Sequence, residues 1–476
     1  MKHYLLLIFF LLCGVLVQAQ EGWTLQRCID YAFEHNIQIQ QSKVSLQIAE
    51  ANKLQATGLV LPNLNASGTH GYNFGQTIDP FTNTFATTRI QSNSFSMATN
   101  LILFNGFQNL NSIKQAGINV EVQEAQIEKM QNDIALSIAN SFLNVLFNRE
   151  FLAIAKSNRD ATALQADRIG KLVDAGQLTQ GDLSDVTAQL MLDEANVVAN
   201  TNSLQLAMLS LTQLLQLPAD LARDFDITIP SDNEIEGLEL IGNAEVAVNA
   251  ALNNFPEVKG AQSSVLSAER GLAIARGGIS PVLSASYSVG TGYSGANKIG
   301  VGDPITFYPQ IGITQNGDAV WTIIPQQTYA DFETKAFGDQ LKDNTNQSLF
   351  FSLRIPLFNG FTTYTNIKRA EANLLNAQYN LDLTRQQLEQ DVLRAYADAQ
   401  ASLSNYQASL KTVEASQVAF DFAKIRFEQG VINSVDYQSA RIRLDNARAT
   451  LLQNKYDYVF KVKVIDFYLG KAITLR

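Results

Sequence analysis

The sequence predicts an internally duplicated α+β membrane protein with four amphipathic β-strands and two very long helical hairpins in each chain. Three observations carry this prediction. A five-residue phrase, Leu103–Phe107, returns as Leu357–Phe361 at an offset of 254 positions (357 minus 103). Two pairs of stretches alternate apolar and polar residues, as half-buried strands do. Proline-free stretches with helical spacing, 107–175 and 361–429, follow the two copies of the phrase.

The duplication extends beyond the phrase. The same offset of 254 relates Gly176 to Gly430 (430 minus 176), whereas upstream an offset of 219 relates Pro62 to Pro281 (281 minus 62). The difference of 35 residues (254 minus 219) indicates an insertion between Pro281 and the second phrase. Two copies are too few for a solenoid, so we interpret them as two halves of one protomer.

Composition excludes several classes of protein. The chain has 476 residues, a net charge of −10 and a pI near 5.0, which argues against binding to nucleic acid. It contains 3 His and 2 Cys, and because Cys13 lies in the predicted leader, only Cys28 stays in the mature chain. No intrachain disulfide, cysteine-based metal site or cofactor is therefore expected.

The N-terminus predicts export. Residues 1–19 have the form of a secretory signal, with Lys2 before an apolar run from Tyr4 to Val17 and cleavage expected after Ala19. No later apolar run is long enough for a transmembrane helix, which needs about 20 residues. An exported chain of this kind is either soluble or crosses an outer membrane as a β-barrel.

The expected elements follow the same order in both halves. The first half spans 20–217 and the second 243–476, joined by a linker over 218–242. In the first half we expect a helix over 24–56, strands near 62–75 and 92–104, and a helical hairpin whose return helix spans 179–217. In the second we expect a helix over 243–276 that Pro256 kinks or delays, strands near 281–293 and 347–358, and a return helix over 433–469.

The strands predict a membrane barrel. In each, one face is apolar and the other carries small polar residues, and each is long enough to cross a bilayer at a tilt, which takes about 9–11 residues. A half-buried sheet in a soluble domain is the alternative. The connections 75–89 and 294–346 have the Gly, Asn, Asp and Pro content of surface loops.

The strand count requires several chains. Four strands cannot close a barrel, since about eight is the smallest usual number, and open edges are not tolerated in lipid. Three protomers would supply twelve strands around a threefold axis. A helix of the predicted length reaches about 100 Å at 1.5 Å per residue, so the hairpins would extend the barrel as a tube. A barrel joined to a tube is a conduit, and no motif assembles a catalytic constellation.

With these features the chain resembles the TolC-like outer-membrane efflux protein family. The likeness rests on the order helix-strand-strand-helix-helix, its duplication, the two Leu-Phe-Asn-Gly-Phe joints and the Gly-centred turns followed by Asp. The resemblance implies a trimeric channel-tunnel with a 12-stranded barrel in the outer-membrane lipid and a coiled-coil helical barrel in the periplasm. It implies an exit duct for an inner-membrane pump, reached through a periplasmic adaptor protein.

The resemblance also assigns roles to residues of the hairpin ends. Gly176 and Gln177, and Gly430 and Val431, fall at the tips that meet the adaptor. Asp436 takes the place of a carboxylate that narrows the pore, six residues after the second tip glycine (436 minus 430). Three copies of it would form an acidic ring that favours cations.

Other gate positions depart from the family pattern. Asp182 takes the place of a gate-bracing residue, but the second expected carboxylate is Ser439, and Phe427 and Ile432 replace the Tyr and Arg partners of the gate network. Asp185 is a candidate for the missing charge. The alternative for Asp182 and Asp436 is a structural role in capping the helix N-terminus and complementing its dipole.

Two rival functions remain open at this level. One is a free-standing trimeric outer-membrane porin, against which the long periplasmic hairpins argue. The other is a secreted coiled-coil scaffold, against which the four amphipathic strands argue. No enzymatic activity is expected.

Overall fold

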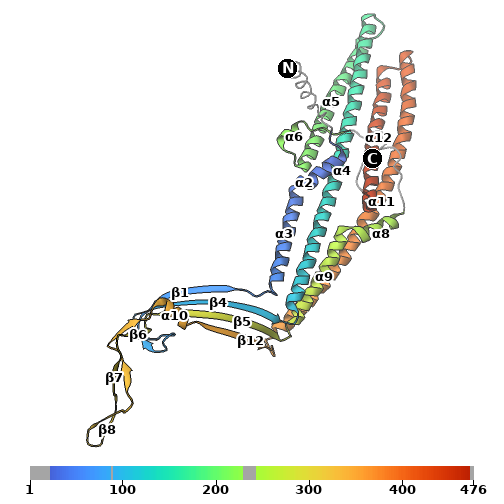
Figure 1. Ribbon diagram of the computed structural model, residues 1–476. Helices are drawn as coiled ribbons and strands as arrows, with labels where there is room; N and C mark the ends of the chain where they lie inside the picture. The colour runs from blue at the N-terminus through green and yellow to red at the C-terminus, as the bar shows by residue number, and fades with distance from the viewer. Residues whose placement is uncertain (1–21, 87–88, 229–242, 472–476) are drawn as a thin grey trace, which may run out of the picture. The chain divides into compact units, whose positions relative to one another are not determined.

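The computed structural model describes residues 22–86, 89–228 and 243–471 (Figure 1). The predicted signal peptide and most of the predicted linker lie outside this part of the chain. The described residues form two compact units, and each unit combines segments from both sequence halves. Unit 1 comprises Met1–Glu50, Ile118–Leu266 and Leu375–Arg476, and unit 2 comprises Ala51–Gly117 and Ser267–Leu374.

Unit 2 is built on one four-stranded antiparallel sheet in the order β1-β4-β5-β12. Figure 1 shows the four strands side by side, with β4 and β5 in the middle. The central pair joins one strand from each half, so the duplicated halves meet within a single sheet. The strands are β1 Asn65–Asn73, β4 Ile90–Phe104, β5 Val282–Ser294 and β12 Asn346–Arg354.

The register of the sheet confirms the amphipathic pattern of the strands. Met97 pairs with Ala66 on one side and with Val289 on the other, so apolar side chains form a row across β1, β4 and β5. In the neighbouring row Ser96 pairs with Ser67, and their hydroxyls are 2.7 Å apart. Side chains in one cross-strand row share a face. One face of the sheet is therefore apolar and the other is small and polar.

The fourth strand ends earlier than predicted. Its expected range reached 358, but β12 ends at Arg354. Pro356 follows two residues later. Proline lacks the N–H that a ladder needs, so it is confined to strand ends and edges.

The two shorter helices of each half are separate elements, and the single helix predicted over 24–56 is wrong. The chain forms α2 (Leu25–His35) and α3 (Ile37–Gly58), with Asn36 between them. The buried Asn36 side chain accepts a hydrogen bond from the backbone N–H of Gln38 at 2.9 Å and thereby caps α3. An asparagine in an otherwise helical pattern was the available signal.

The second half breaks at the equivalent position. Here α8 (Ala244–Asn254) and α9 (Pro256–Gly277) flank Phe255, which stands 219 positions after Asn36 (255 minus 36). Pro256 is the first residue of α9, a position where its missing N–H costs nothing. The expected disturbance at Pro256 is therefore confirmed as a clean break.

The repeated phrase forms the joint between strand and helix, as predicted. Gly106 has φ +66° and Gly360 has φ +60°. The structure adds a second left-handed residue at each joint, because Phe107 and Phe361 have φ of 61° and 63°. A Cβ on Gly106 would lie 2.4 Å from the carbonyl oxygen of Gly277, so this position requires glycine.

The long helices are confirmed. The first is α4 (Gln108–Asp174) and the second is α11 (Thr362–Glu428), each of 67 residues, and they return as α5 (Gln180–Leu215) and α12 (Ser434–Tyr468). No helix in the described parts of the chain combines the length and apolarity needed to cross a membrane. The core of unit 1 packs residues of α2, α4, α5 and α12. It includes Cys28, Ala32, Ile138, Phe142, Val145, Leu211, Leu215 and Val459.

The two connections contain regular structure that the sequence analysis did not predict. Residues 75–89 include a small hairpin of β2 (Thr77–Ile78) and β3 (Phe85–Ala86). The connection 294–346 forms a long two-stranded ribbon and then α10 (Phe337–Asp343). The ribbon pairs β6 Lys298–Val301 with β11 Asp331–Thr334, β7 Ile305–Phe307 with β10 Gln326–Thr328, and β8 Gln310–Ile313 with β9 Ala319–Trp321.

Candidate functional site

Both helical hairpins turn through the same motif. Gly176 has φ +74° and Gly430 has φ +73°, the left-handed conformation of a helix C-cap. At the first turn the N–H of Gly176 donates to Val173 O at 2.9 Å and the N–H of Gln177 donates to Leu172 O at 2.8 Å. The second turn repeats this pair of bonds, from Gly430 to Phe427 O at 3.0 Å and from Val431 to Arg426 O at 2.8 Å.

The tips are exposed. Gly176, Gln177, Gly430 and Val431 all lie on the surface of the chain, and the isopropyl group of Val431 is 60% exposed. The turn bonds use backbone groups only, so the side chains of Gln177 and Val431 take no part in them.

Asp182 has a structural role. Its carboxylate accepts hydrogen bonds from the N–H of Thr179 at 3.0 Å and from the Thr179 hydroxyl at 2.7 Å, while its own N–H donates to that hydroxyl at 3.3 Å. This reciprocal pair is a capping box at the start of α5. The Thr179 hydroxyl and N–H lower the pKa of Asp182 below the ordinary aspartate value.

Asp436 is placed differently, although it stands at the equivalent position. Asn433 caps α12 by accepting a hydrogen bond from the N–H of Asp436 at 2.8 Å. The carboxylate of Asp436 is exposed and accepts no hydrogen bond from any residue in the described part of the chain. The two equivalent acids therefore differ: the carboxylate of Asp182 completes a cap, and that of Asp436 takes no part in one.

The other predicted gate residues lie on both hairpins. Asp185 and Ser439 are exposed on the second turns of α5 and α12. Phe427 stacks on Tyr437 within the second hairpin, with ring centroids 5.0 Å apart and an interplanar angle of 23°. Burial raises the pKa of Tyr437. This aromatic stack holds α11 to α12 where the family pattern has hydrogen-bonding side chains.

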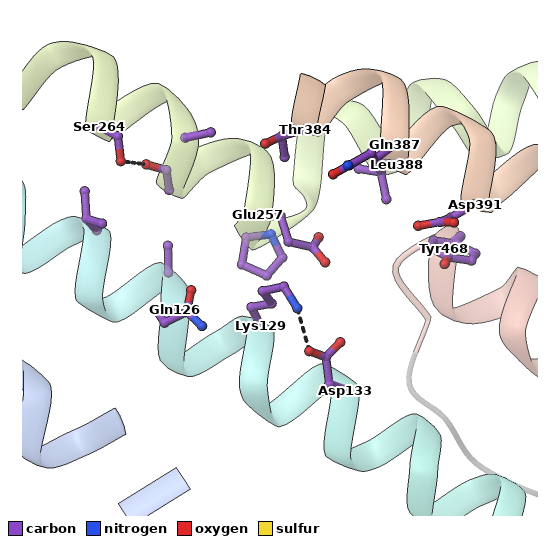
Figure 2. A pocket seen from close by; sticks show the side chains of 15 residues that line it. Gln126, Lys129, Asp133, Glu257, Ser264, Thr384, Gln387, Leu388, Asp391 and Tyr468 are labelled. Carbon is purple, nitrogen blue, oxygen red and sulfur yellow. Dashed lines mark hydrogen bonds and ion pairs between the residues drawn. The ribbon is translucent and has the colours of Figure 1, made fainter. Parts of the chain in front are cut away.

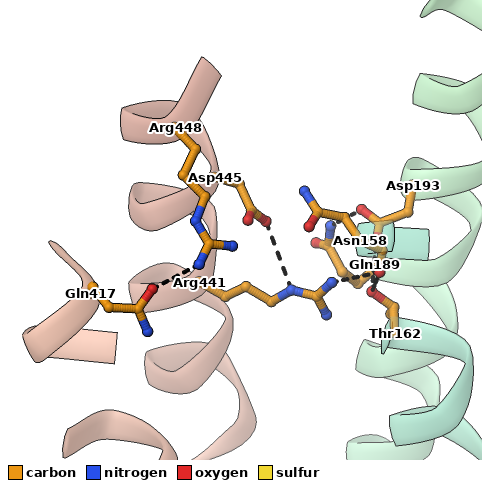
Figure 3. Close-up of polar contacts among 8 residues, drawn as sticks. All are labelled: Asn158, Thr162, Gln189, Asp193, Gln417, Arg441, Asp445 and Arg448. Atoms are coloured by element: carbon orange, nitrogen blue, oxygen red, sulfur yellow. Dashed lines mark hydrogen bonds and ion pairs between the residues drawn. The ribbon is translucent and has the colours of Figure 1, made fainter. Parts of the chain in front are cut away.

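A buried arginine that the sequence analysis missed joins the two hairpins (Figure 3). Arg441 of α12 is 6% exposed and donates from Nη2 to the backbone oxygen of Asn158 in α4 at 2.5 Å. Its Nε lies 3.7 Å from the carboxylate of Asp445 one turn later. Arg441 occupies the same helical stripe as the buried Tyr437 and Leu444, so a charge within an apolar stripe was the signal available in the sequence.

Polar groups surround this contact on both sides. On the α4–α5 hairpin, Thr162 donates its hydroxyl hydrogen to Asp193, which also accepts from Gln189 Nε2 at 2.8 Å. On the α11–α12 hairpin, Arg448 donates to Gln417 Oε1 at 2.7 Å. The Arg441 side chain thus crosses from one hairpin to the other, as Figure 3 shows.

The interface beside Arg441 is incompletely satisfied. Both polar atoms of the Gln438 side chain and Nη1 of Arg441 are buried without a hydrogen-bond partner in the described structure, as is Nε2 of Gln165. A buried polar group without a partner costs about 1–3 kcal/mol. The packing of α12 against α4 therefore includes groups that would gain from a different arrangement.

A second interhairpin contact lies nearer the tips. Nη1 of Arg168 in α4 is 3.7 Å from the carboxylate of Glu428, the last residue of α11. Arg168 precedes the end of α4 by six residues (174 minus 168). The first hairpin therefore extends beyond the second by about 9 Å, given a rise of 1.5 Å per residue.

Unit 1 also contains an acidic cavity of about 560 Å³ between α4, α9, α11 and α12 (Figure 2). Lys129 Nζ is paired with the Asp133 carboxylate at 2.6 Å, and Glu257 and Asp391 line the opposite side. Burial raises the pKa of Glu257, and burial raises the pKa of Tyr468 to about 12. No group of three or more His, Cys, Asp or Glu residues within the described ranges could hold a metal ion.

The family model for outer membrane efflux proteins matches residues 28–216 and 247–471, which covers most of the chain in two segments. The chain belongs to the outer membrane efflux protein family. The two segments each contain one helical hairpin with its Gly turn.

Individual relatives of the family are distant in sequence. The outer membrane efflux protein BepC of Brucella suis biovar 1 is 21% identical over 448 residues, 93% of this chain and 84% of BepC. The outer membrane protein TolC of Escherichia coli K12 is 22% identical over 365 residues, 75% of this chain and 64% of TolC. The solved structure of the outer membrane protein VceC from Vibrio cholerae matches with a TM-score of 0.73 at 17% identity, over 94% of this chain and 96% of VceC.

Membership assigns this protein to the outer membrane and to efflux transport. The fold agreement with VceC extends over both the sheet and the hairpins, since nearly the whole chain is matched. The resemblance to the TolC-like family drawn from the joints and turns is thereby confirmed.

Proposed function

We propose that this outer membrane efflux protein is a trimeric exit duct, which passively conducts substrates delivered by an inner-membrane pump through a periplasmic adaptor. Tripartite efflux and type I secretion both use a duct of this form. The observation that carries the proposal is the combination of an open amphipathic sheet with 67-residue helices in one chain. On this proposal the protein transports and does not catalyse.

The open sheet supports the trimer. The outer edges of β1 and β12 pair with no strand in the described residues, and the apolar face of the sheet is exposed at Met97, Leu349 and Phe351. Unpaired strand edges are incompatible with a lone chain in lipid, whereas the apolar face suits the lipid-facing surface of a closed barrel. Three copies joined from β12 to the next β1 give twelve strands and bury every edge.

The exposed tips support docking of an adaptor. Gln177 and Val431 stand directly after the tip glycines in turns with the same backbone bonds, so the two hairpins present similar shapes. In a trimer this gives six related hairpin ends at the periplasmic end of the duct. We propose that these six ends are the adaptor's contact surface.

The free carboxylate supports a selective constriction at the same end. Asp436 is exposed at the start of α12, and its carboxylate takes no part in the cap, which uses only its backbone N–H. Three copies around an axis would form an acidic ring, as rings of carboxylates do in cation channels. We assign Asp436 to this constriction, with Asp182 as the structural brace of α5.

The experiment is single-channel conductance of the purified protein in a planar bilayer, compared for wild type, Asp436→Asn and Asp182→Asn. The expected wild-type conductance is small and cation-selective. Asp436→Asn reduces the cation selectivity, whereas Asp182→Asn leaves it unchanged because that carboxylate serves a cap. A large steady conductance that neither substitution alters would favour a free-standing porin and overturn the proposal.

Delivery by a pump is tested in cells. Deletion of the gene is expected to raise the intracellular accumulation of a fluorescent efflux substrate, and the wild-type gene restores export. Substitution of both tip residues by glutamate, Gln177→Glu with Val431→Glu, is expected to abolish export while single-channel conductance is retained. Normal export by this tip variant would refute the assignment of the adaptor surface.

A further inference from the structure

The ribbon of residues Lys298–Thr334 carries an apolar stripe that no described residue of the chain covers. Within each strand of its ascending arm, alternate residues are apolar and exposed. A two-stranded ribbon in water is marginally stable by itself, and an exposed apolar surface of this extent marks an interaction site. The stripe consists of Ile299, Val301, Ile305, Phe307, Ile311 and Ile313.

The base of the ribbon is fixed to the sheet. Gln340 is fully buried; its Oε1 accepts from the N–H of Ser294 at 2.9 Å and its Nε2 donates to Ser294 O at 3.1 Å. The hydroxyl of Ser294 donates to the buried carboxylate of Asp79. Asp79 belongs to the β1–β4 connection, so the loops of the two halves are tied together at the last residue of β5. The ribbon is therefore an ordered extension of the sheet.

The ribbon leads directly into an edge of the sheet. It stands between β5 and β12, and β12 begins at Asn346. In the proposed trimer the free edge of β12 pairs with β1 of the next copy. Neighbouring strands of the sheet are antiparallel, so the start of β12 lies beside the end of the neighbouring β1, which is Asn73.

The neighbouring copy presents apolar residues at that place. Phe74, Ile78 and Phe85 follow the end of β1, and their side chains are 75%, 54% and 71% exposed. We name these three residues the receiving patch. The same junction thus brings an uncovered apolar stripe from one copy next to an uncovered apolar patch of another.

We propose that the ribbon of each copy packs its apolar stripe on the receiving patch of the next copy and clamps the two together beyond the barrel. The inference rests on the trimer of the proposed function. The contact joins two different surfaces and repeats three times around the axis, so it closes into a ring. Only the second half carries the 35-residue insertion (254 minus 219), which provides one ribbon for each junction.

The test measures the temperature at which the detergent-purified trimer dissociates, by gel electrophoresis without boiling. The stripe variant is Ile305→Ser with Phe307→Ser, the patch variant is Phe85→Ser, and the matched control is Ile323→Ser with Ile324→Ser, which removes exposed apolar groups of the ribbon outside the stripe. The stripe and patch variants are each expected to lower the dissociation temperature. The combined variant is expected to lower it no further, because both remove one contact.

The outcomes separate the two proposals. A wild-type protein that is not a trimer refutes the proposed function. A wild-type trimer whose dissociation temperature is unchanged in the stripe and patch variants, or is lowered as much in the control, overturns the clamp alone. Additive effects in the combined variant also overturn it, since they show two independent partners.

A second measurement tests the contact directly. Phe85→Cys and Phe307→Cys are introduced on two separately tagged chains, in a mature protein whose natural Cys28 is buried. A bis-maleimide reagent is expected to link the two tagged chains when they are co-expressed, and to give no dimer when either is expressed alone. Absence of the mixed dimer, in trimers that contain both chains, would contradict the clamp.

Discussion

Arg441→Gln tests whether the hydrogen bond between the two hairpins of one chain holds them together. Arg441 is buried and donates to the carbonyl of Asn158 on the other hairpin. A hydrogen bond from a charged group contributes about 1.5–3 kcal/mol. Loss of that bond shifts the balance from joined toward separated hairpins about 10- to 100-fold, since 1.4 kcal/mol is tenfold. The expected result is a correspondingly higher open probability in single-channel recordings.

Arg448→Gln is the matched control for this prediction. Arg448 lies on the same helix and donates to Gln417 of α11, so its bond stays within one hairpin. Its substitution removes one arginine charge and one hydrogen bond without touching the contact between hairpins. Equal open probabilities in wild type and Arg441→Gln would refute the reasoning, and so would an equal increase in Arg448→Gln.

Three further changes test other parts of the structure. Thr179→Ala removes the capping box of α5 and is expected to lower the stability of that helix by about 1 kcal/mol. The loss should appear as faster proteolysis at the first hairpin, and unchanged proteolysis would contradict the prediction. Burial raises the pKa of Glu257 in the folded state, so folding stability should fall as pH rises from 4.5 through that raised pKa. Glu257→Gln should reduce this dependence of stability on pH in thermal melts. An unaltered pH dependence would show that another group causes it. Gly106→Ala places a Cβ 2.4 Å from Gly277 O and should reduce the amount of protein in the outer membrane, whereas Gly117→Ala, which meets no neighbour, should not.

The sequence predicted the elements that obey a strict period. The four strands and both 67-residue helices were predictable because alternation and helical spacing are local properties of the chain. The glycine turns were predictable for the same reason, since a left-handed cap at Gly176 and Gly430 depends on a few neighbouring residues.

The features that the sequence did not predict depend on contacts between residues far apart in the chain. The break at Asn36 is stabilised by its own side chain and by Gln216, whose Oε1 accepts from the N–H of Ile37 at 3.0 Å across 179 positions. The link from Arg441 to Asn158 spans 283 positions. Neither the hydrogen-bond partner nor the burial of Arg441 could be predicted from the residues next to it in the sequence.

The candidate site was predictable in position and only partly in role. Sequence equivalence placed Asp182 and Asp436 at corresponding points, but their divergence depends on the caps that precede them. Thr179 supplies a hydroxyl that engages Asp182, whereas Asn433 offers a side chain that caps α12 without binding the carboxylate of Asp436. The difference between Thr179 and Asn433 at the two N-caps therefore decides whether the carboxylate of the following aspartate is bound in the cap.

The difference in reach between the two hairpins of one chain has a consequence for how a partner could bind their ends. Two contacts show that the hairpins are offset along their length: the ion pair from Arg168 to Glu428 and the bond from Arg441 to Asn158. In both, the residue of the second hairpin is closer to its tip than the residue of the first hairpin is to its own tip. In a trimer the six ends would then alternate between two heights separated by about 9 Å, at 1.5 Å per residue. On the proposed adaptor contact, identical adaptor subunits could not meet these alternating ends with one set of contacts. That proposal therefore requires either two binding conformations of the adaptor or a shift of the hairpins that brings their ends to one height when the complex assembles.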